Sequence, residues 1–288
     1  MLGMKLLASL PVFIWIGDNF HWGLLIMNLG LSGKSVFVAA ASKGLGRASA
    51  LAFAQEGALV TIASRNQEQL ASAQEEILAA TGHKVNTLRM DVTNEEEIRR
   101  AISTAAESQG GLDVVVTNAG GPPGGTFADM SDEDWQRGFE LNLLSVIRMI
   151  REAVPYMKSA GGGRIVNLAS TSIKQPIPGL ILSNVFRAGV QSLAKTLAEE
   201  LAKDGILINT IAPGRIATDR ITELDTARAA NKGTSLEFIQ AEAVQGIPLG
   251  RMGTPEEFAR IVTFYGSFAN TYVTGQSIMV DGGMLRGL

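Results

Sequence analysis

The chain has 288 residues, enough for one large domain or two small ones, and its 46% hydrophobic and 18% charged residues are typical of a compact protein with a large core. Its formal net charge of -3 argues against nucleic acid as the main partner, because nucleic-acid-binding domains usually carry a basic excess. The absence of cysteine excludes disulfides, thiolate catalysis and most zinc sites, so we expect no metal ion and a cytoplasmic location.

Residues 1–30 differ in composition from the rest of the chain. The apolar run LLASLPVFIWIG resembles the core of a signal peptide, but no small-residue cleavage site follows it. Asp18, Asn19 and His21 interrupt the run, which leaves too few apolar residues for a stable membrane span. We expect an upstream extension, with Met27 as a candidate start, and keep a membrane-surface anchor as the alternative.

From Lys34 onward, short apolar runs rich in valine and isoleucine alternate with longer segments at helical spacing. Such strands, separated by helices, predict a parallel sheet that is covered on both faces. We expect residues 31–288 to form a single α/β domain with a doubly wound parallel sheet, a Rossmann fold, whose ligand crevice lies at the carboxyl ends of the strands. In chain order the predicted elements are strand 35–40, helix 45–56, strand 59–64, helix 67–80, strand 85–90, helix 94–108, and strands 112–118, 164–169, 206–212 and 276–280.

A glycine turn, AAASKGLGRA, stands between the first predicted strand and the first predicted helix. A tight turn that leads into a helix N-terminus presents unpaired backbone N–H groups and the positive end of the helix dipole to a phosphate. The usual dinucleotide fingerprint G-x-G-x-x-G is absent, so the turn on its own is also compatible with helix packing and no ligand.

The turn resembles the T-G-x-x-x-G-x-G motif of the short-chain dehydrogenases/reductases, with Gly44 and Gly46 at the second and third glycines and Ala40 at the first. Further matches follow in the family's order: MDVT at 90–93, TNAG at 117–120, APGRIAT at 212–218 and TGQSIMVDGG at 274–283. The resemblance runs from about Leu31 to Met284 and implies a bound nicotinamide dinucleotide. Position by position, it implies cofactor contacts from Ala40, Ser42, Lys43, Gly44, Leu45, Gly46, Ser64, Arg65, Asp91, Val92, Asn118, Ala119, Gly120, Pro213, Gly214, Ile216 and Thr218.

The end of the second strand favours NADP (NADPH) over NAD. A carboxylate there would bind the ribose 2′-OH and repel a 2′-phosphate. Ser64 and Arg65 stand at this place instead, and Lys43 lies in the glycine turn. Two cations and no anion favour the phosphorylated cofactor, although Arg65 is also compatible with an ordinary solvated loop residue.

The catalytic tetrad of this family is Asn, Ser, Tyr and Lys, and the chain matches it only in part. Asn142 and Ser170 match the first two positions. Ser183 stands where the family has its tyrosine, and Arg187, one helical turn later, where it has its lysine. A serine hydroxyl is a far weaker acid than a phenol, and arginine does not release a proton. None of the three tyrosines of the chain lies in a segment expected at the site.

Loss of general acid catalysis costs a factor of about 10² to 10⁴ in rate, whereas positioning and electrostatic contributions remain. In such an enzyme Ser170 would bind a carbonyl oxygen, Arg187 would stabilise the developing alkoxide, and water held by Asn142 would supply the proton. Lys174 is a further candidate donor, although it also fits an ordinary solvated lysine. Ser183 is expected to cap its helix.

The resemblance implies an oxidoreductase that transfers a hydride to or from a carbonyl or alcohol, close to the 3-oxoacyl-acyl-carrier-protein reductase branch. A 3-oxoacyl thioester substrate is implied by that branch alone. The competing hypothesis is a catalytically silent NADP-binding protein that acts as a sensor or as an assembly subunit.

Residues 219–248 are expected to form a substrate lid, because the segment is longer than a plain connection. Its mixture of arginine and glutamate gives no indication of the substrate's charge. The family also implies a homodimer or homotetramer, and the apolar stripes in 141–157 and 185–201 fit either the core or a dimer surface.

Overall fold

The computed structural model describes residues 27–287, so the expected N-terminal extension lies outside the described residues except for its last four positions. Seven strands form one parallel sheet in the order β3-β2-β1-β4-β5-β6-β7. The chain runs from β1 to β3 in one direction and returns through β4 to β7 in the other, so the sheet is doubly wound, as predicted.

The elements alternate along the chain as the sequence pattern predicted, and each predicted strand or helix is present with bounds that differ by at most two residues. The strands are β1 (Ser35–Ala39), β2 (Leu59–Ser64), β3 (Asn86–Arg89), β4 (Val114–Thr117), β5 (Gly163–Leu168), β6 (Ile206–Pro213) and β7 (Ser277–Val280). The helices are α1 (Gly44–Gln55), α2 (Gln67–Thr81), α3 (Glu95–Gln109), α4 (Asp132–Phe139), α5 (Ser145–Ser159), α6 (Ile181–Ala202), α7 (Asp219–Lys232), α8 (Leu236–Gln245) and α9 (Pro255–Tyr265).

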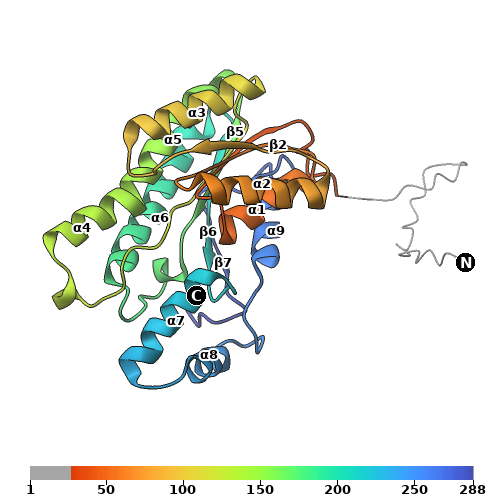
Figure 1. Cartoon of the computed structure of the whole chain (residues 1–288). Coiled ribbons are helices and arrows are strands. Elements are labelled where there is room, and N and C mark those ends of the chain that lie inside the picture. The colour runs from red at the N-terminus through yellow and green to blue at the C-terminus, as the bar shows by residue number, and fades with distance from the viewer. Residues whose placement is uncertain (1–26, 288) are drawn as a thin grey trace, which may run out of the picture.

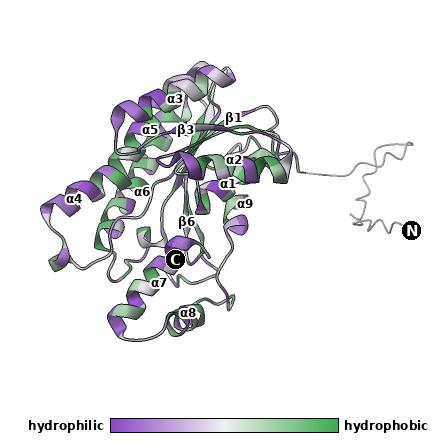
Figure 2. Cartoon of the chain, in the orientation of Figure 1, coloured by the Kyte–Doolittle hydropathy of each residue, from purple (hydrophilic) through white to green (hydrophobic). Residues whose placement is uncertain are grey.

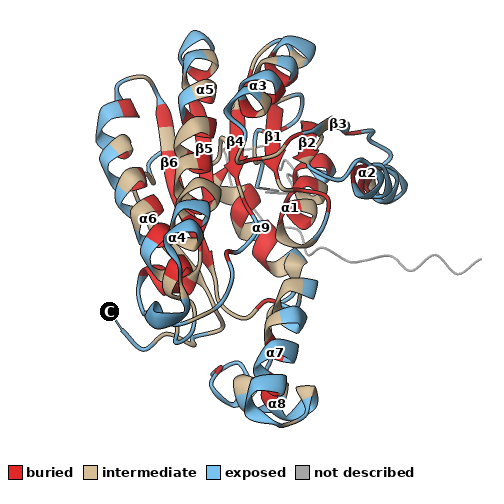
Figure 3. Cartoon of the chain, turned by 60° about the vertical axis from the view of Figure 1, so that its left-hand side comes forward, coloured by how far each residue is buried: buried red, intermediate tan, exposed pale blue. Residues whose placement is uncertain are grey.

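The two faces of the sheet carry two separate cores. In β1, Val36 and Val38 pack with α1, α2 and α9, whereas Phe37 and Ala39 pack with α3, α5 and α6. Successive side chains of a strand point to opposite faces, and here each face is covered by helices. The central strands β1, β4 and β5 are therefore buried (Figure 3), whereas the edge strand β3 is partly exposed. Helix α4 carries many hydrophilic residues (Figure 2).

Helix α9 packs closely on α1 because its C-cap residue, Gly266, has no side chain. A Cβ on Gly266 would lie 2.6 Å from Cζ of Phe53 in α1 and 3.3 Å from Cγ1 of Val114 in β4. Just beyond, the backbone N–H of Phe268 donates to the carbonyl oxygen of Leu29 at 2.9 Å. Residue 29, although part of the expected extension, is thus attached to the end of α9.

Helices α7 and α8 stand apart from the sheet, beyond the carboxyl ends of its strands (Figure 1), and their outer surfaces are exposed (Figure 3). They make up most of the segment predicted as a lid. Within residues 27–287, no helix has the length and hydropathy needed to cross a bilayer, and no three potential metal-ligating side chains gather.

Gly266→Ala is expected to lower the free energy of unfolding by about 1–3 kcal/mol, because the added methyl group forces α9 away from Phe53. Urea unfolding followed by circular dichroism measures the change. Gly246→Ala is the matched control, since Gly246 is also a helix C-cap with negative φ and a Cβ there meets its nearest atom at 3.5 Å. Equal stability of the two variants would contradict the close approach of α9 to α1.

Candidate functional site

A cavity of about 900 Å³ opens at the carboxyl ends of β1, β2, β4, β5 and β6. The strand order reverses between β1 and β4, and doubly wound sheets bind their ligands at that point. Gly46, Asp91 and Asn142 are the predicted site residues that do not line the cavity. The predicted site residues that do line it are Ala40, Ser42, Lys43, Gly44, Leu45, Ser64, Arg65, Val92, Asn118, Ala119, Gly120, Ser170, Ser183, Arg187, Pro213, Gly214, Ile216 and Thr218.

The glycine turn after β1 is held by contacts that only small residues allow. Ala40 has φ +47°, and among the described residues it is the one non-glycine residue with positive φ. Its carbonyl oxygen accepts a hydrogen bond from Nδ2 of Asn118 at 3.2 Å. A Cβ on Gly46 would lie 2.5 Å from that same oxygen. Gly46 therefore lets α1 pack against the turn instead of lining the cavity.

The N-terminus of α1 faces the cavity without a side-chain cap. Asn66 and Asn94 accept backbone hydrogen bonds at the starts of α2 and α3, whereas Lys43, at the same position of α1, makes no such bond. The first N–H groups of a helix have no partner within the helix, and the helix dipole makes that end positive. The start of α1 is therefore suited to an anion such as a phosphate.

The end of β2 forms the neighbouring wall. The Oγ atoms of Ser42 and Ser64 lie 3.0 Å apart, Arg65 is exposed beside them, and no acidic residue of the lining belongs to this wall. Asn66 and Gln69 also line this wall, and the sequence analysis missed them because they follow the matched motif.

Ser170, Ser183 and Arg187 line the part of the cavity beyond β5. Ser170 stands two residues after the end of β5, and its Oγ accepts from the backbone N–H of Ser172 at 3.2 Å. Ser183 lies within α6, whose N-cap is Leu180, so the expected capping role of Ser183 is wrong.

Arg187 lies one turn later on α6, with only 8% of its surface exposed. Its Nη1 donates to the carbonyl oxygen of Leu168 at 2.7 Å. Burial, together with the nearby charge of Arg220, lowers the pKa of Arg187 to about 10, so the guanidinium remains charged at neutral pH. The side chain therefore holds a positive charge in the wall of the cavity.

Asn142 and Asp91 act from behind the cavity wall. Asn142 lies in a short π-helical segment, Glu140–Leu144, and its Nδ2 donates to the carbonyl oxygen of Gly120 at 2.9 Å. Its Oδ1 is buried and has no hydrogen-bond partner in the described residues. Asp91 closes a turn, since its Oδ1 accepts from the backbone N–H and the hydroxyl of Thr93 at 2.9 and 2.8 Å.

None of the three tyrosines lines the cavity: Tyr156 packs beside the core, Tyr265 ends α9, and Tyr272 is 97% exposed. Lys174 is exposed and does not line the cavity either. The candidate donor Lys174 and the three tyrosines are thus absent from the cavity lining, and Lys43, at the start of α1, is the lysine that the lining contains.

The outer wall of the cavity comes from α7, α8 and the C-terminal segment. The sequence predicted a lid over residues 219–248 but not which of its residues line the cavity. Glu223 and Glu237 of the predicted lid do not line the cavity, whereas Arg220 and Arg228 do. The lid segment contributes two cations, Arg220 and Arg228, and two anions, Asp219 and Glu242, so its part of the wall is mixed in charge. The excess of cations in the cavity comes from other segments. The charged residues that line the whole cavity are Lys43, Arg65, Arg187, Arg215, Arg220 and Arg228, against Asp219 and Glu242.

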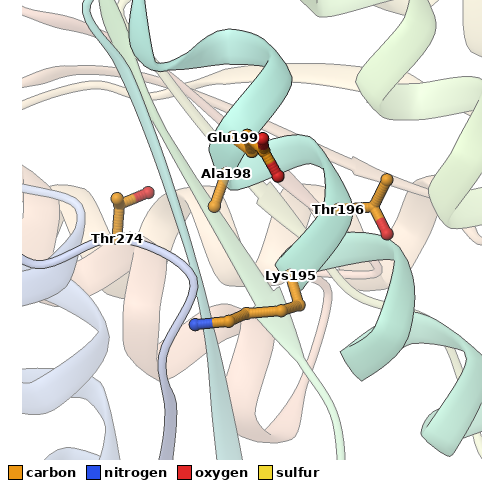
Figure 4. Close-up of a pocket in the computed structure, with 5 residues that line it drawn as sticks. All are labelled: Lys195, Thr196, Ala198, Glu199 and Thr274. Carbon is orange, nitrogen blue, oxygen red and sulfur yellow. The ribbon is translucent and has the colours of Figure 1, made fainter.

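A second, more open hollow of about 450 Å³ lies on α6 beside the loop that precedes β7 (Figure 4). Lys195 extends toward the loop that carries Thr274, while Thr196 lies on the other side of the helix. Lys195 and Glu199 are exposed, and no residue of this hollow lines the large cavity. The chemistry of the predicted site is therefore confined to the large cavity.

Known proteins resemble this chain over most of its length. The family described as Enoyl-(Acyl carrier protein) reductase matches residues 39–285. The 3-oxoacyl-acyl-carrier-protein reductase FabG of Thermotoga maritima is 35% identical over 255 residues, which cover 88% of this chain and 99% of that protein. Dehydrogenase/reductase SDR family member 4 of Oryctolagus cuniculus is 34% identical over 254 residues, covering 88% of this chain and 94% of that protein.

Among solved structures, the L-sorbose reductase of Gluconobacter frateurii, complexed with NADPH and L-sorbose, aligns with a TM-score of 0.86 and 34% identity. The alignment covers 91% of this chain and 100% of that one.

Ala40→Gly is expected to raise the free energy of unfolding by about 1 kcal/mol, because glycine adopts a positive φ without the strain that a Cβ causes. Urea unfolding measures the difference. Ala39→Gly, one residue earlier in the buried strand β1, should instead lower stability, by about 0.5–1 kcal/mol. A loss of stability in both variants would show that Ala40 is not strained.

Proposed function

The chain belongs to the short-chain dehydrogenase/reductase family, and on that basis we propose that it is an NADP-dependent oxidoreductase that transfers a hydride to or from a carbonyl or alcohol substrate. The observation that carries the proposal is the cationic cavity at the switch point of the sheet, which combines the uncapped start of α1 with Ser170 and Arg187. The related L-sorbose reductase, whose structure contains NADPH, supports the same cofactor.

The residues present fit such a cofactor. The start of α1 would hold the diphosphate, and Lys43 and Arg65 would meet a 2′-phosphate beside β2, where the lining contains no carboxylate. Asn118 and Gly46 would act indirectly, by holding the turn in which Ala40 allows close approach of the backbone. Asp91 would contribute through its turn, since its carboxylate is already bonded to Thr93.

When bound, the nicotinamide ring donates or accepts the hydride. In the direction of reduction, the hydroxyl of Ser170 would donate a hydrogen bond to the substrate carbonyl oxygen. The guanidinium of Arg187 would stabilise the negative charge that develops on that oxygen. The unpartnered Oδ1 of Asn142 would hold a water molecule that supplies the proton. The curated relatives named as 3-oxoacyl reductases make a 3-oxoacyl thioester one candidate substrate.

The absence of a phenol from the cavity lining favours a second candidate, a catalytically silent NADP-binding protein that acts as a sensor or as an assembly subunit. Both functions use the same cofactor site, and they differ only in turnover. A homodimer or homotetramer remains a proposal from family membership, supported by the exposure of the apolar Val185 on α6.

We expect the protein to bind NADPH at least about tenfold more tightly than NADH, as measured by cofactor fluorescence. Arg65→Glu should remove most of this preference, because the new carboxylate repels the 2′-phosphate. Arg100→Glu is the control, since it makes the same charge change on an exposed arginine of α3 outside the cavity. Equal binding of the two cofactors by the unmodified protein would contradict the proposed cofactor.

The double variant Ser183→Tyr with Arg187→Lys should reduce ketones about 10² to 10⁴ times faster than the unmodified protein, because it supplies the missing acid. The consumption of NADPH across a panel of ketones, 3-oxoacyl thioesters and imines measures the rates. Ser183→Phe with Arg187→Lys adds the ring without the hydroxyl and serves as the control. If the tyrosine variant is no faster than this control, the assignment of position 183 is wrong. Tight NADPH binding by the unmodified protein with no turnover on any substrate would favour the silent alternative.

A further inference from the structure

Two largely buried arginine side chains, Arg164 and Arg215, have partners within the chain. One makes hydrogen bonds to backbone carbonyls, and the other forms an ion pair. Arg164, 7% exposed, donates from Nη2 and Nε to the carbonyl oxygen of Asn270 at 2.8 and 3.1 Å and also to other backbone carbonyls. Arg215 forms an ion pair with Asp225, which is 2% exposed. These contacts are the usual ways in which a protein offsets the cost of burying a guanidinium.

Arg187 has neither arrangement. It makes one hydrogen bond, to the carbonyl oxygen of Leu168, although a guanidinium carries five N–H donors. No carboxylate of the described residues forms an ion pair with it, and the residue lines the cavity. None of its remaining nitrogen atoms is among the buried atoms of the described residues that lack a partner, so these donors are open to the cavity, where an anionic ligand could supply the counter-charge.

Arg220, in the first turn of α7, brings a second positive charge to the same cavity. Its Nη2 donates to the carbonyl oxygen of Pro122 at 3.0 Å, and the guanidinium lies over Gly121, where a Cβ would be 3.1 Å from Nη2. It is close enough to Arg187 to oppose the charge of that side chain. Its own carboxylate neighbour, Glu223, is 3.5 Å away and largely exposed to solvent, which screens the pair.

We propose that Arg187 and Arg220 together bind the carboxylate of the substrate, and that the substrate is a 2-oxo acid. This inference rests on the proposed function. A planar guanidinium matches a carboxylate with two parallel hydrogen bonds. In a 2-oxo acid the carboxylate adjoins the reacting carbonyl, so one end of the molecule can meet Arg187 and Ser170 at once.

The other residues that line the cavity indicate the chemical character of the substrate beyond its 2-oxo acid group. Apolar side chains of α7 and the C-terminal segment, Ile221, Leu224, Met284 and Leu285, line the same cavity and favour an apolar group. The reaction would convert a 2-oxo acid, NADPH and a proton into a 2-hydroxy acid and NADP⁺.

The cofactor is the other source from which an anion could reach these arginines. The start of α1 and the cations beside β2 would bind the phosphates of the cofactor. Arg187 lies elsewhere, on α6, in the turn after Ser183. This separation favours the substrate carboxylate as the anion at Arg187.

Isothermal titration calorimetry of the full chain, with and without saturating NADP⁺, tests the proposal. NADP⁺ has no hydride to give, so the binding of an oxo acid is measured without turnover. The matched probes are 2-oxo-4-phenylbutanoate and 4-phenylbutan-2-one, in which a methyl group replaces the carboxylate. We expect the acid to bind the NADP⁺ complex at least about tenfold more tightly than the ketone.

Arg220→Gln should reduce this preference, taken as the ratio of the affinities for the acid and the ketone in the same variant, about tenfold. Arg228→Gln is the control, since Arg228 also lies on α7 and lines the cavity but has Glu242 as an ion-pair partner at 3.7 Å. The preference for the acid should survive in this control.

Equal binding of the acid and the ketone overturns the inference, and so does an equal loss of preference in both arginine variants. Binding of the acid only to the cofactor-free protein, with displacement by NADPH, would assign the arginines to the cofactor and overturn it as well. Failure of NADPH to bind would instead overturn the proposed function, and the comparison of the two probes on the cofactor-free protein would still decide the inference.

Discussion

The close contact between the start of α1 and the turn after β1 is the constraint on which the site depends. The oxygen of Ala40 receives the amide of Asn118 and leaves no room for a Cβ at position 46, so α1 begins directly above the ends of β1 and β4. That helix end carries no side-chain cap, so its positive pole faces the point between β1 and β4 where the strand order of the sheet reverses. A larger residue at position 46 would move the helix and separate the phosphate position from Ser170.

The fold followed from the sequence because the central strands β1, β4 and β5 are fully buried and most strands read as short apolar runs. The predicted starts of α2 and α3 lie within one residue of the observed ones, and there Asn66 and Asn94 accept backbone hydrogen bonds. The π-helical segment around Asn142 was not foreseen, since it arises where α4 continues into α5 and no local motif marks it.

The site residues that follow a strand within a recognisable motif were predictable from the sequence. The site residues that come from α7 and from the C-terminal segment were not. Ser183 and Arg187 both line the cavity, as their spacing of one helical turn on α6 indicated. Arg220, Met284 and Leu285 come from segments whose faces only the packed structure determines. The composition of the lid did not show which of its charged residues line the cavity: Asp219, Arg220, Arg228 and Glu242 do, whereas Glu223 and Glu237 do not.

The hydrogen bond from Arg220 to Pro122 joins α7 to the loop after β4, two segments that are otherwise far apart in the chain. Any outward swing of α7 must first break this bond, which in a partly exposed position contributes only about 1.5–3 kcal/mol. Thermal motion can break so weak a latch without help from a partner protein. A single arginine side chain thus connects the outer wall of the cavity to the loop after β4.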